Sequence, residues 1–408
     1  MQPATQQTPF ASTDQTGTRS QLFLIIAIIL VAIDLRPGIT AIGPVLPTII
    51  DEFQLSHTVA SLMTSIPDLL MGTLALPTPW LVRRFGINPV LQIALGILCI
   101  AMIARAFSPN TATLLGSTVG VGAGIAIAGA LFGGLIKTRF ATRVAFIMGL
   151  YTTAISIGSA LSAGTTGWLA QTVGLGWRTS TGIWSIFGIV AMIAWWFATR
   201  HEPKVVNTTA PATSIFAGLP FRNKTAWLIA LYFAGVNFLF YSVLTWTAPM
   251  YQEIGLSAAT AGLVLASFTI AFMFSSPLIG IFSKSTDRRV WLAGAAAVTA
   301  AGLIGLVAAP DALPFVWLPL CAIGLGAAFT LAMTLPLDNT HTADEANRWN
   351  AFNLTVGYLI AATGPLLTGY LRDVTGHFAV PFALLAGVAL LMLAATPFLK
   401  PHTAVTVA

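Results

Sequence analysis

Twelve long apolar runs alternate with short polar stretches along the chain. Most runs reach the about 20 residues that a helix needs to cross a hydrocarbon core about 30 Å thick. The pattern therefore predicts an all-α membrane protein with twelve transmembrane helices. The first six are expected over residues 22–50, 57–81, 88–107, 111–136, 144–170 and 177–198, and the second six over residues 224–251, 257–282, 290–309, 313–337, 350–372 and 378–398.

Polar segments divide these predicted helices into two groups of six. Residues 199–223, which contain three prolines, form the expected linker between one lobe over residues 22–198 and another over residues 224–398. Residues 1–21 are polar and are expected to be a disordered tail, and residues 399–408 form a second tail.

Composition excludes a soluble fold, because 56% of the residues are hydrophobic, 8% are charged and the mean hydropathy is +0.84. The net charge of +6 comes from basic residues in loops and tails and does not indicate nucleic-acid binding. Only Arg105, Arg178 and Arg372 fall on one side of the predicted membrane, and the other basic loop residues fall on the opposite side. The positive-inside rule therefore predicts cytoplasmic termini and a cytoplasmic linker.

The two halves of the sequence repeat each other. The segment Asp51-Glu52-Phe53-Gln54-Leu55-Ser56 matches Gln252-Glu253-Ile254-Gly255-Leu256-Ser257 at an offset of 201 residues. Six crossings in each half keep both halves the same way up, so the repeat is parallel. Transporters with parallel repeats bind their substrate between the halves, near the middle of the membrane.

A basic residue interrupts the first apolar run at the segment Asp34-Leu35-Arg36-Pro37-Gly38. Arg36 lies fourteen residues past Leu22, which is roughly 21 Å along a helix and near mid-membrane depth. Pro37 removes one helical hydrogen bond, and Gly38 loosens the next turn. We expect Arg36 to face a water-filled cavity and bind an anion, because intramembrane ionisable residues mark substrate paths. The alternative is an arginine held in a structural ion pair.

The repeat offset of 201 carries Arg36 onto Asn237, in the seventh predicted helix. Tyr241 lies one turn further, and Trp246 lies nine residues from Asn237. A cation, an amide and aromatic walls suit a flat or linear polar solute. Asn237 can instead serve as an interhelical hydrogen-bonding group, and the two aromatic residues can serve as ordinary packing.

Two acidic residues, Asp34 and Asp68, also lie within predicted helices. Asp34 is about 200° around the helix from Arg36, so these two side chains are not expected to face each other. Asp68 is near mid-depth and has three possible roles: proton carrier, counter-ion to Arg36 or neutral structural donor. Both acids are candidates for proton coupling.

Several motifs resemble the cyanate/nitroimidazole permease family of the major facilitator superfamily. They are Leu35-Arg36-Pro37 with Gly43-Pro44-Val45-Leu46-Pro47, Leu135-Ile136-Lys137-Thr138-Arg139-Phe140 after the fourth helix, and Phe240-Tyr241-Ser242-Val243-Leu244-Thr245-Trp246 followed by Gly255-Leu256-Ser257. The resemblance implies a multi-pass permease of the bacterial inner membrane for a small anionic or nitro-bearing solute. It also implies that Tyr151, Asn353 and Tyr358 flank the cavity, because the fifth and eleventh helices do so in this superfamily.

The loop after the second helix departs from the superfamily pattern Gly-x-x-x-Asp-Arg-x-Gly, since Pro79 and Arg83 replace the first Gly and the Asp. In the matching loop of the second half, Lys284 stands in the acidic place. The candidate gating residues are therefore basic: Arg83, Arg84, Lys137, Arg139, Arg288 and Arg289. The alternative is that they only set orientation.

The expected function is secondary active transport of a small anion, cyanate in the first instance, by alternating access. A proton-coupled exporter of a nitroimidazole-like or other drug-like solute on the same fold is the alternative. No nucleotide-binding loop, catalytic motif or metal-spaced histidine cluster is present in the sequence. We therefore expect no enzyme activity, cofactor or metal, and a monomer whose partners are a small anion and the lipid bilayer, without nucleic acid.

Overall fold

The computed structural model describes residues 15–140, 142–200, 219–283, 285 and 287–400, and all regular structure in these ranges is helical. The first half contains α1 (Gln15–Asp34), α2 (Pro37–Thr40), η1 (Gly43–Val45), α3 (Leu46–Phe53), α4 (His57–Ala60), α5 (Leu62–Leu74), α6 (Thr78–Phe85), α7 (Ile87–Ala106), α8 (Thr111–Arg139), α9 (Val144–Gly167), η2 (Trp168–Thr172), α10 (Gly176–Gly182) and α11 (Ser185–Thr199). The second half contains α12 (Lys224–Glu253), α13 (Ala258–Phe282), α14 (Arg289–Ala308), α15 (Pro314–Asp338), α16 (Ala343–Ala361), α17 (Thr363–Thr375), α18 (Ala379–Ala395) and η3 (Thr396–Phe398).

Within the described ranges, eleven helical stretches are long and apolar enough to cross a membrane. The remaining predicted crossing, over residues 57–81, is present as the consecutive helices α4, α5 and α6, interrupted at Ser61 and around Pro77. Each of these pieces is too short to count as a span alone. The twelve-helix membrane fold expected from the apolar runs is thus confirmed, although the second crossing is segmented.

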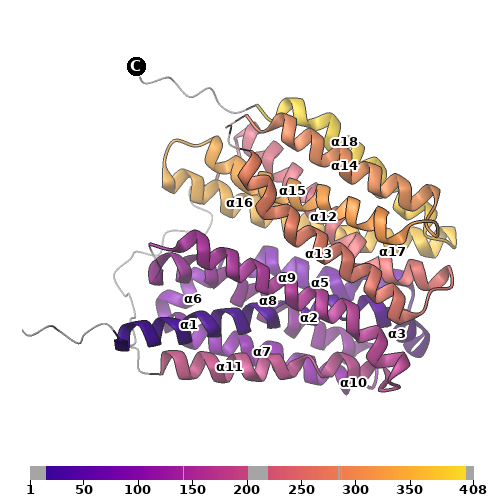
Figure 1. Ribbon diagram of the computed structural model, residues 1–408, viewed down its shortest axis with the longest axis horizontal. Coiled ribbons are helices and arrows are strands. Elements are labelled where there is room, and N and C mark those ends of the chain that lie inside the picture. Colours follow the sequence, from indigo (N-terminus) through magenta and orange to yellow (C-terminus); the bar gives the residue numbers. More distant parts are fainter. Residues whose placement is uncertain (1–14, 141, 201–218, 284, 286, 401–408) are drawn as a thin grey trace, which may run out of the picture.

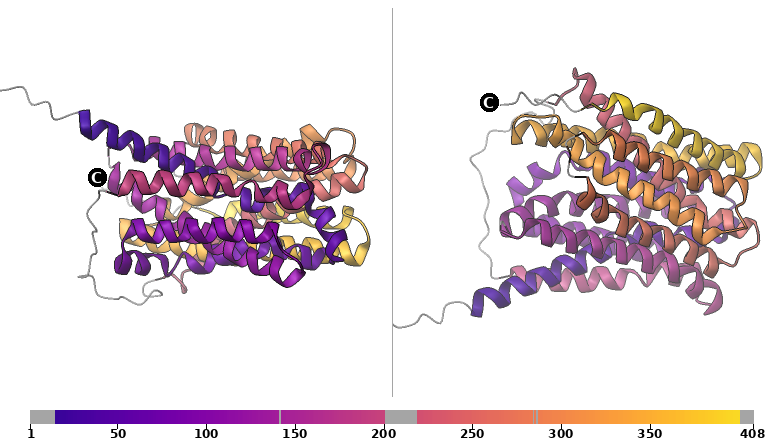
Figure 2. Two further views of the ribbon diagram at one scale, coloured as in Figure 1. Left: turned by 90° about the horizontal axis from the view of Figure 1, so that it is seen from below. Right: turned by 45° about the horizontal axis from the view of Figure 1, so that its top comes forward.

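The helices form two groups that lie side by side along their length, the first half in indigo to magenta and the second in pink to yellow (Figure 1). The right-hand view of Figure 2 also shows the two groups side by side. Six crossings return each half to its starting side, so α11 ends and α12 begins at one end of the bundle. We call this the linker end and the opposite end, which carries α3, α10 and the end of α17, the distal end.

Helix boundaries differ most from the predicted ones at the ends of the bundle. Helix α1 begins at Gln15, inside the segment expected to be a tail, and α16 begins at Ala343 instead of residue 350. Residues 1–14, 201–218 and 401–408, which hold most of the predicted tails and linker, and Lys284 lie outside the described residues.

Pro37 breaks the first crossing as its chemistry requires. Helix α1 ends at Asp34, and α2 restarts at Pro37 with Arg36 as its N-terminal cap. Because proline has no N–H, the carbonyl of Ile33 loses its helical donor. Gly158 of α9 packs directly against this carbonyl, and a Cβ atom at position 158 would collide with it. The break therefore permits an unusually close approach of α1 and α9.

The two lobes meet through polar contacts at the distal end. Asp373, near the end of α17, accepts hydrogen bonds from the backbone amides of His57 and Thr58, both at 2.8 Å, at the start of α4. It also contacts the His57 ring at 2.8 Å and the Thr58 hydroxyl at 2.6 Å. In the other direction, Gln171 of η2 accepts a 3.2 Å hydrogen bond from the amide of Ala258, at the start of α13.

These two distal contacts are related by the repeat. Gln171 and Asp373 are 202 residues apart, and the helix starts that they cap follow Ser56 and Ser257, which are 201 residues apart. Each lobe thus caps a helix N-terminus of the other, which satisfies amide groups that the helix itself leaves free. The distal end is closed in this conformation.

The close contact at Gly158 gives a stability prediction. Gly158→Ala should destabilise the protein by about 1–3 kcal/mol, because the methyl group must push α9 away from the Ile33 carbonyl. Gly149→Ala, in the same helix, is the control, since a Cβ there meets nothing within 4 Å. The thermal midpoint of the detergent-solubilised protein measures the difference, and equal midpoints for the two variants would contradict the packing argument.

Candidate functional site

A cavity of about 390 Å³ lies between the two lobes. Its walls come from the α2 cap and from α9, α12, α13, α15 and α16. On α9 the lining positions run from Ser156 to Gly149, and on α13 from Phe272 to Pro277, in both cases toward the linker end. The lining residues are Arg36, Gly149, Thr152, Thr153, Ile155, Ser156, Asn237, Phe240, Tyr241, Phe272, Met273, Ser276, Pro277, Phe329, Thr330 and Tyr358.

Arg36 is the single charged side chain among these lining residues. Its Nη1 donates a 3.0 Å hydrogen bond to the Tyr241 hydroxyl, and its guanidinium carbon lies 5.9 Å from the centre of the Tyr241 ring. No carboxylate among the described residues lies within ion-pair distance of Arg36. A cation in this position, without an acidic partner in contact, is available to an anion.

Tyrosine side chains gather around the Arg36 guanidinium from three helices. Tyr241 of α12 and Tyr358 of α16 both line the cavity, with ring centres 6.3 Å apart. Tyr151 of α9 stacks on Phe132 at 4.8 Å and lies close enough to Arg36 to interact with it electrostatically. The structure thus brings three predicted site residues to Arg36 and offers hydroxyl groups that can both donate and accept hydrogen bonds.

The two intramembrane acids lie in different places. Asp68 of α5 is fully buried, and its charge can interact with that of Arg36, although neither carboxylate oxygen has a hydrogen-bond partner in the described part of the chain. Asp34 is also fully buried but lies beside Gly188 of α11 and Cys99 of α7, inside the first lobe. Asp34 therefore faces away from Arg36, and Asp68 is the acid whose charge can reach Arg36, although Asp68 is not among the residues that line the cavity.

Asn237 lines the same cavity as Arg36, whereas three other predicted site residues, Tyr151, Trp246 and Asn353, do not. The Asn237 amide nitrogen donates to the Phe233 carbonyl at 2.9 Å, which fixes the plane of the side chain. Trp246 is fully buried, with its Nε1 donating to the Pro365 carbonyl at 3.0 Å and its ring 5.6 Å from that of His57. Nine residues correspond to about 14 Å along a helix, which carries Trp246 past the cavity into the distal contacts.

Asn353, another predicted residue outside the cavity lining, lies in α16 and is 1% exposed. Neither polar atom of its side chain has a hydrogen-bond partner within the described ranges. The predicted position of Asn353 at the cavity wall is therefore not found among the lining residues.

The six basic gating candidates all lie at the linker end. Lys137 and Arg139 are in the last turn of α8, and Arg83 and Arg84 are in the last turn of α6. The Arg84 guanidinium lies 5.6 Å from the Trp80 ring centre and 5.5 Å from that of Phe85.

In the second half, two acids form ion pairs with the basic loop residues. Neither acid was among the predicted gating residues. Arg288 pairs with Asp338 at the end of α15, and Arg289 pairs with Asp287 at 2.7 Å. The Arg289 guanidinium and backbone amide lower the pKa of Asp287 to about 2. Asp338, the partner of Arg288, lies 201 residues after Lys137. The repeat offset therefore connects Asp338 to one of the predicted gating residues.

Arg105 lies in a different environment from the one that the charge distribution predicted. It was expected to be a loop charge at the distal side, but it is 2% exposed in the last turn of α7. Its Nη1 donates to the Gly38 carbonyl at 2.6 Å, and its Nη2 donates to the Thr118 hydroxyl of α8 at 3.2 Å. Its position inside the apolar run over residues 88–107 was the available signal.

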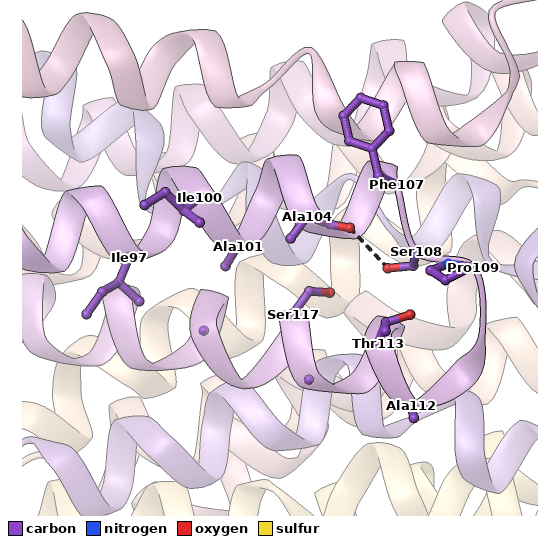
Figure 3. A pocket seen from close by; sticks show the side chains of 12 residues that line it. Ile97, Ile100, Ala101, Ala104, Phe107, Ser108, Pro109, Ala112, Thr113 and Ser117 are labelled. Carbon is purple, nitrogen blue, oxygen red and sulfur yellow. Dashed lines mark hydrogen bonds between the residues drawn. The ribbon is translucent and has the colours of Figure 1, made fainter.

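A wider groove of about 850 Å³ lies between α7 and α8 (Figure 3). It is lined by small and apolar side chains, and no lining residue is charged. The hydroxyl of Ser108 bonds within its own segment, to the Ala104 carbonyl at 3.2 Å (Figure 3). This groove has no polar group directed at a ligand, so the cavity at Arg36 is the candidate functional site.

Comparisons with known proteins agree with the fold. The family model described as Major Facilitator Superfamily matches residues 22–346 and also residues 247–407. The cyanate transport protein CynX of Escherichia coli (strain K12) is 31% identical over 362 residues, which cover 88% of this chain and 92% of that protein. The 2-nitroimidazole transporter of the same strain is 31% identical over 390 residues, or 94% and 95% of the two chains.

Among solved structures, a bacterial homologue of the human lysosomal transporter Spinster, in an inward-facing and unoccupied conformation, superposes with a TM-score of 0.72. The two chains share 20% sequence identity, and the match covers 95% of each. This likeness concerns the fold alone. Together with the family match and the relatives above, it shows that the chain belongs to the major facilitator superfamily of transporters and resembles its cyanate and nitroimidazole permeases.

Proposed function

We propose that this transporter carries a small anion, cyanate in the first instance, across the bacterial inner membrane by alternating access. The observation that carries the proposal is Arg36, a cation in the inter-lobe cavity with no carboxylate of the described residues in contact. A buried charge is stable only when it is paired and hydrogen-bonded. An anionic solute supplies the missing partner.

The cavity favours a small and flat or linear solute. A guanidinium presents parallel N–H groups that match two acceptor atoms in one plane. The hydroxyls of Tyr241 and Tyr358 add hydrogen-bonding groups, while Phe240, Phe272 and Phe329 form apolar walls. The names of the two relatives refer to cyanate, a linear anion, and to a solute with a planar nitro group, and both chemistries suit these walls.

Transport requires the cavity to reach each side of the membrane in turn. In this conformation its lining extends toward the linker end, while the contacts of Asp373 and Gln171 hold the distal end closed. With the orientation given by the positive-inside rule, the linker end is cytoplasmic. Release to the other side then needs the distal contacts to part and the linker-end loops to approach.

A second candidate is proton-coupled export of a nitroimidazole-like or other drug-like solute. Asp68 favours it, because this buried carboxyl group has no hydrogen-bond partner in the described ranges and lies near Arg36. A carboxyl group that binds a proton in one conformation and competes for the guanidinium in another couples a proton to substrate release. Uptake of radiolabelled cyanate into proteoliposomes, with and without a pH gradient, separates the two functions. Cyanate entry supports the first proposal, and absence of entry in both conditions rejects it.

Replacement of Arg36 tests the anion site. Arg36→Lys should weaken the apparent affinity for cyanate roughly tenfold or more, because an ammonium group does not reproduce the planar fork and charged hydrogen bonds are worth about 1.5–3 kcal/mol. Arg36→Ala should abolish saturable uptake. Arg143→Ala, which removes an exposed cation at the start of α9, is the matched control and should transport normally. Wild-type uptake by correctly folded Arg36→Ala protein would refute the assignment.

Replacement of Asp68 tests proton coupling. Asp68→Asn should abolish accumulation driven by a pH gradient but leave exchange of substrate for substrate intact, because the amide cannot release a proton. Asp34→Asn serves as the control, since Asp34 is equally buried but lies away from the cavity. Proton flux is measured with a pH probe inside vesicles after substrate addition. If wild-type protein admits substrate without proton movement, Asp68 has a structural role only.

A further inference from the structure

Arg105 is a buried cation that the proposed transport function does not use directly. Its two terminal nitrogens bond to Gly38 and Thr118, and its Nε has no hydrogen-bond partner in the described part of the chain. No carboxylate in that part lies within ion-pair distance. Arg105 thus connects three helices, α7, α2 and α8, through neutral acceptors.

Stability alone does not account for a guanidinium in this position. Removing a charge from water costs several kcal/mol, and replacing buried ionic groups by apolar side chains of similar volume is often neutral or stabilising. A methionine would fill much of the same space. The contribution specific to arginine is the pair of directed hydrogen bonds, and the shorter of these goes to the backbone at the break after Arg36.

The Gly38 carbonyl needs a donor from outside its own helix. In a continuous helix the amide of Ile42 would bond to it, but this amide donates to the Ile39 carbonyl instead, at 3.3 Å. Gly38 also lies directly on α8, since an added Cβ would come within 2.8 Å of Val121. Arg105 therefore satisfies an acceptor that the helix break leaves free and that has no room for a side chain beside it.

The position of α2 determines the position of Arg36. The Arg36 carbonyl accepts the amide of Ile39 at 2.9 Å and the amide and hydroxyl of Thr40, both at 3.0 Å. The Thr40 hydroxyl also contacts that of Ser162 in α9 at 2.5 Å. Helix α2 is thus held by Arg105 on one side and by α9 on the other, and a shift of α2 moves the backbone that carries the Arg36 side chain.

We infer that Arg105 is a positioning residue for the anion site: by holding the Gly38 carbonyl it fixes α2 and thereby aims the Arg36 guanidinium at Tyr241 and the cavity. The inference rests on the proposed anion-binding function of that cavity. Replacement of Arg105 is therefore expected to lower anion affinity more than it lowers the stability of the protein. Mutation of a residue that orients a binding group typically lowers affinity or activity about ten- to a hundredfold.

The test compares Arg105→Met with Arg105→Lys. The methionine variant should keep or raise the thermal midpoint but bind cyanate, nitrite and nitrate about ten- to a hundredfold more weakly than wild type, measured by anion-induced thermal shift. The lysine variant should be intermediate, because an ammonium can still donate to the Gly38 carbonyl. Arg178→Met is the matched control: it removes another distal-end arginine, bonded to Glu52 and Ser108, without touching α2.

Two outcomes overturn the inference. One is wild-type anion affinity in folded Arg105→Met protein. If that variant does not fold, Arg105→Leu, which also removes both hydrogen-bond donors, takes its place, and wild-type affinity there has the same force. A structure of the variant provides a readout independent of the substrate. If wild-type protein binds none of the three anions, the proposed function fails. The positioning role is then still tested: loss of the hydrogen bond between Arg36 and Tyr241 in the variant supports it, and retention of that bond rejects it.

Discussion

The Arg36 guanidinium, which no carboxylate in the described part of the chain contacts, constrains the structure around it. The charge needs hydrogen bonds, and Tyr241 supplies one across the lobe interface. It also needs a route to the cavity, which the break at Pro37 provides by turning the residue out of the α1 helix. The break in turn frees two backbone carbonyls. That of Ile33 packs closely against Gly158, and that of Gly38 accepts a hydrogen bond from Arg105. Several close contacts inside the first lobe therefore follow from the placement of Arg36.

The second lobe contributes only uncharged side chains to the cavity lining. At the position related to Arg36 by the repeat it carries Asn237, in an unbroken helix, with its amide tied to the Phe233 carbonyl. The duplicated architecture thus places charge on one side of the cavity and hydrogen-bonding and aromatic groups on the other. Such a division lets the lobes separate without leaving two like charges or a broken ion pair exposed to lipid.

Much of the fold and part of the site could be predicted because they follow from local rules. Apolar run lengths gave the twelve crossings, and the proline after Arg36 gave the helix break. The repeat offset placed Asn237 in the cavity with Arg36. Trp246 does not line the cavity, and its buried position agrees with the alternative that it serves as ordinary packing. Its distance from Asn237 along the helix carries it to the distal end.

Other features depend on tertiary contacts that no local pattern contains. Arg105 was taken for a loop charge because positive-inside counting considers the depth of a residue and not the direction of its side chain. Its acceptor, the Gly38 carbonyl, is 67 residues away in the sequence. Similarly, the segmentation of the second crossing and the capping of α4 by Asp373 require both lobes to be in place.

The two repeat-related caps at the distal end have unequal strength. Asp373 offers a carboxylate to four donor groups of His57 and Thr58, whereas Gln171 offers one amide oxygen to the Ala258 amide. Hydrogen bonds to charged groups are worth about twice those between neutral groups. The edge where α17 meets α4 therefore depends on a charged group, whereas the edge where η2 meets α13 depends on a neutral hydrogen bond and on close backbone packing of Gly167 against Ala258. The two edges of one closure thus respond to different changes: neutralising Asp373 would loosen only the first, and a side chain larger than glycine at position 167 would disturb only the second.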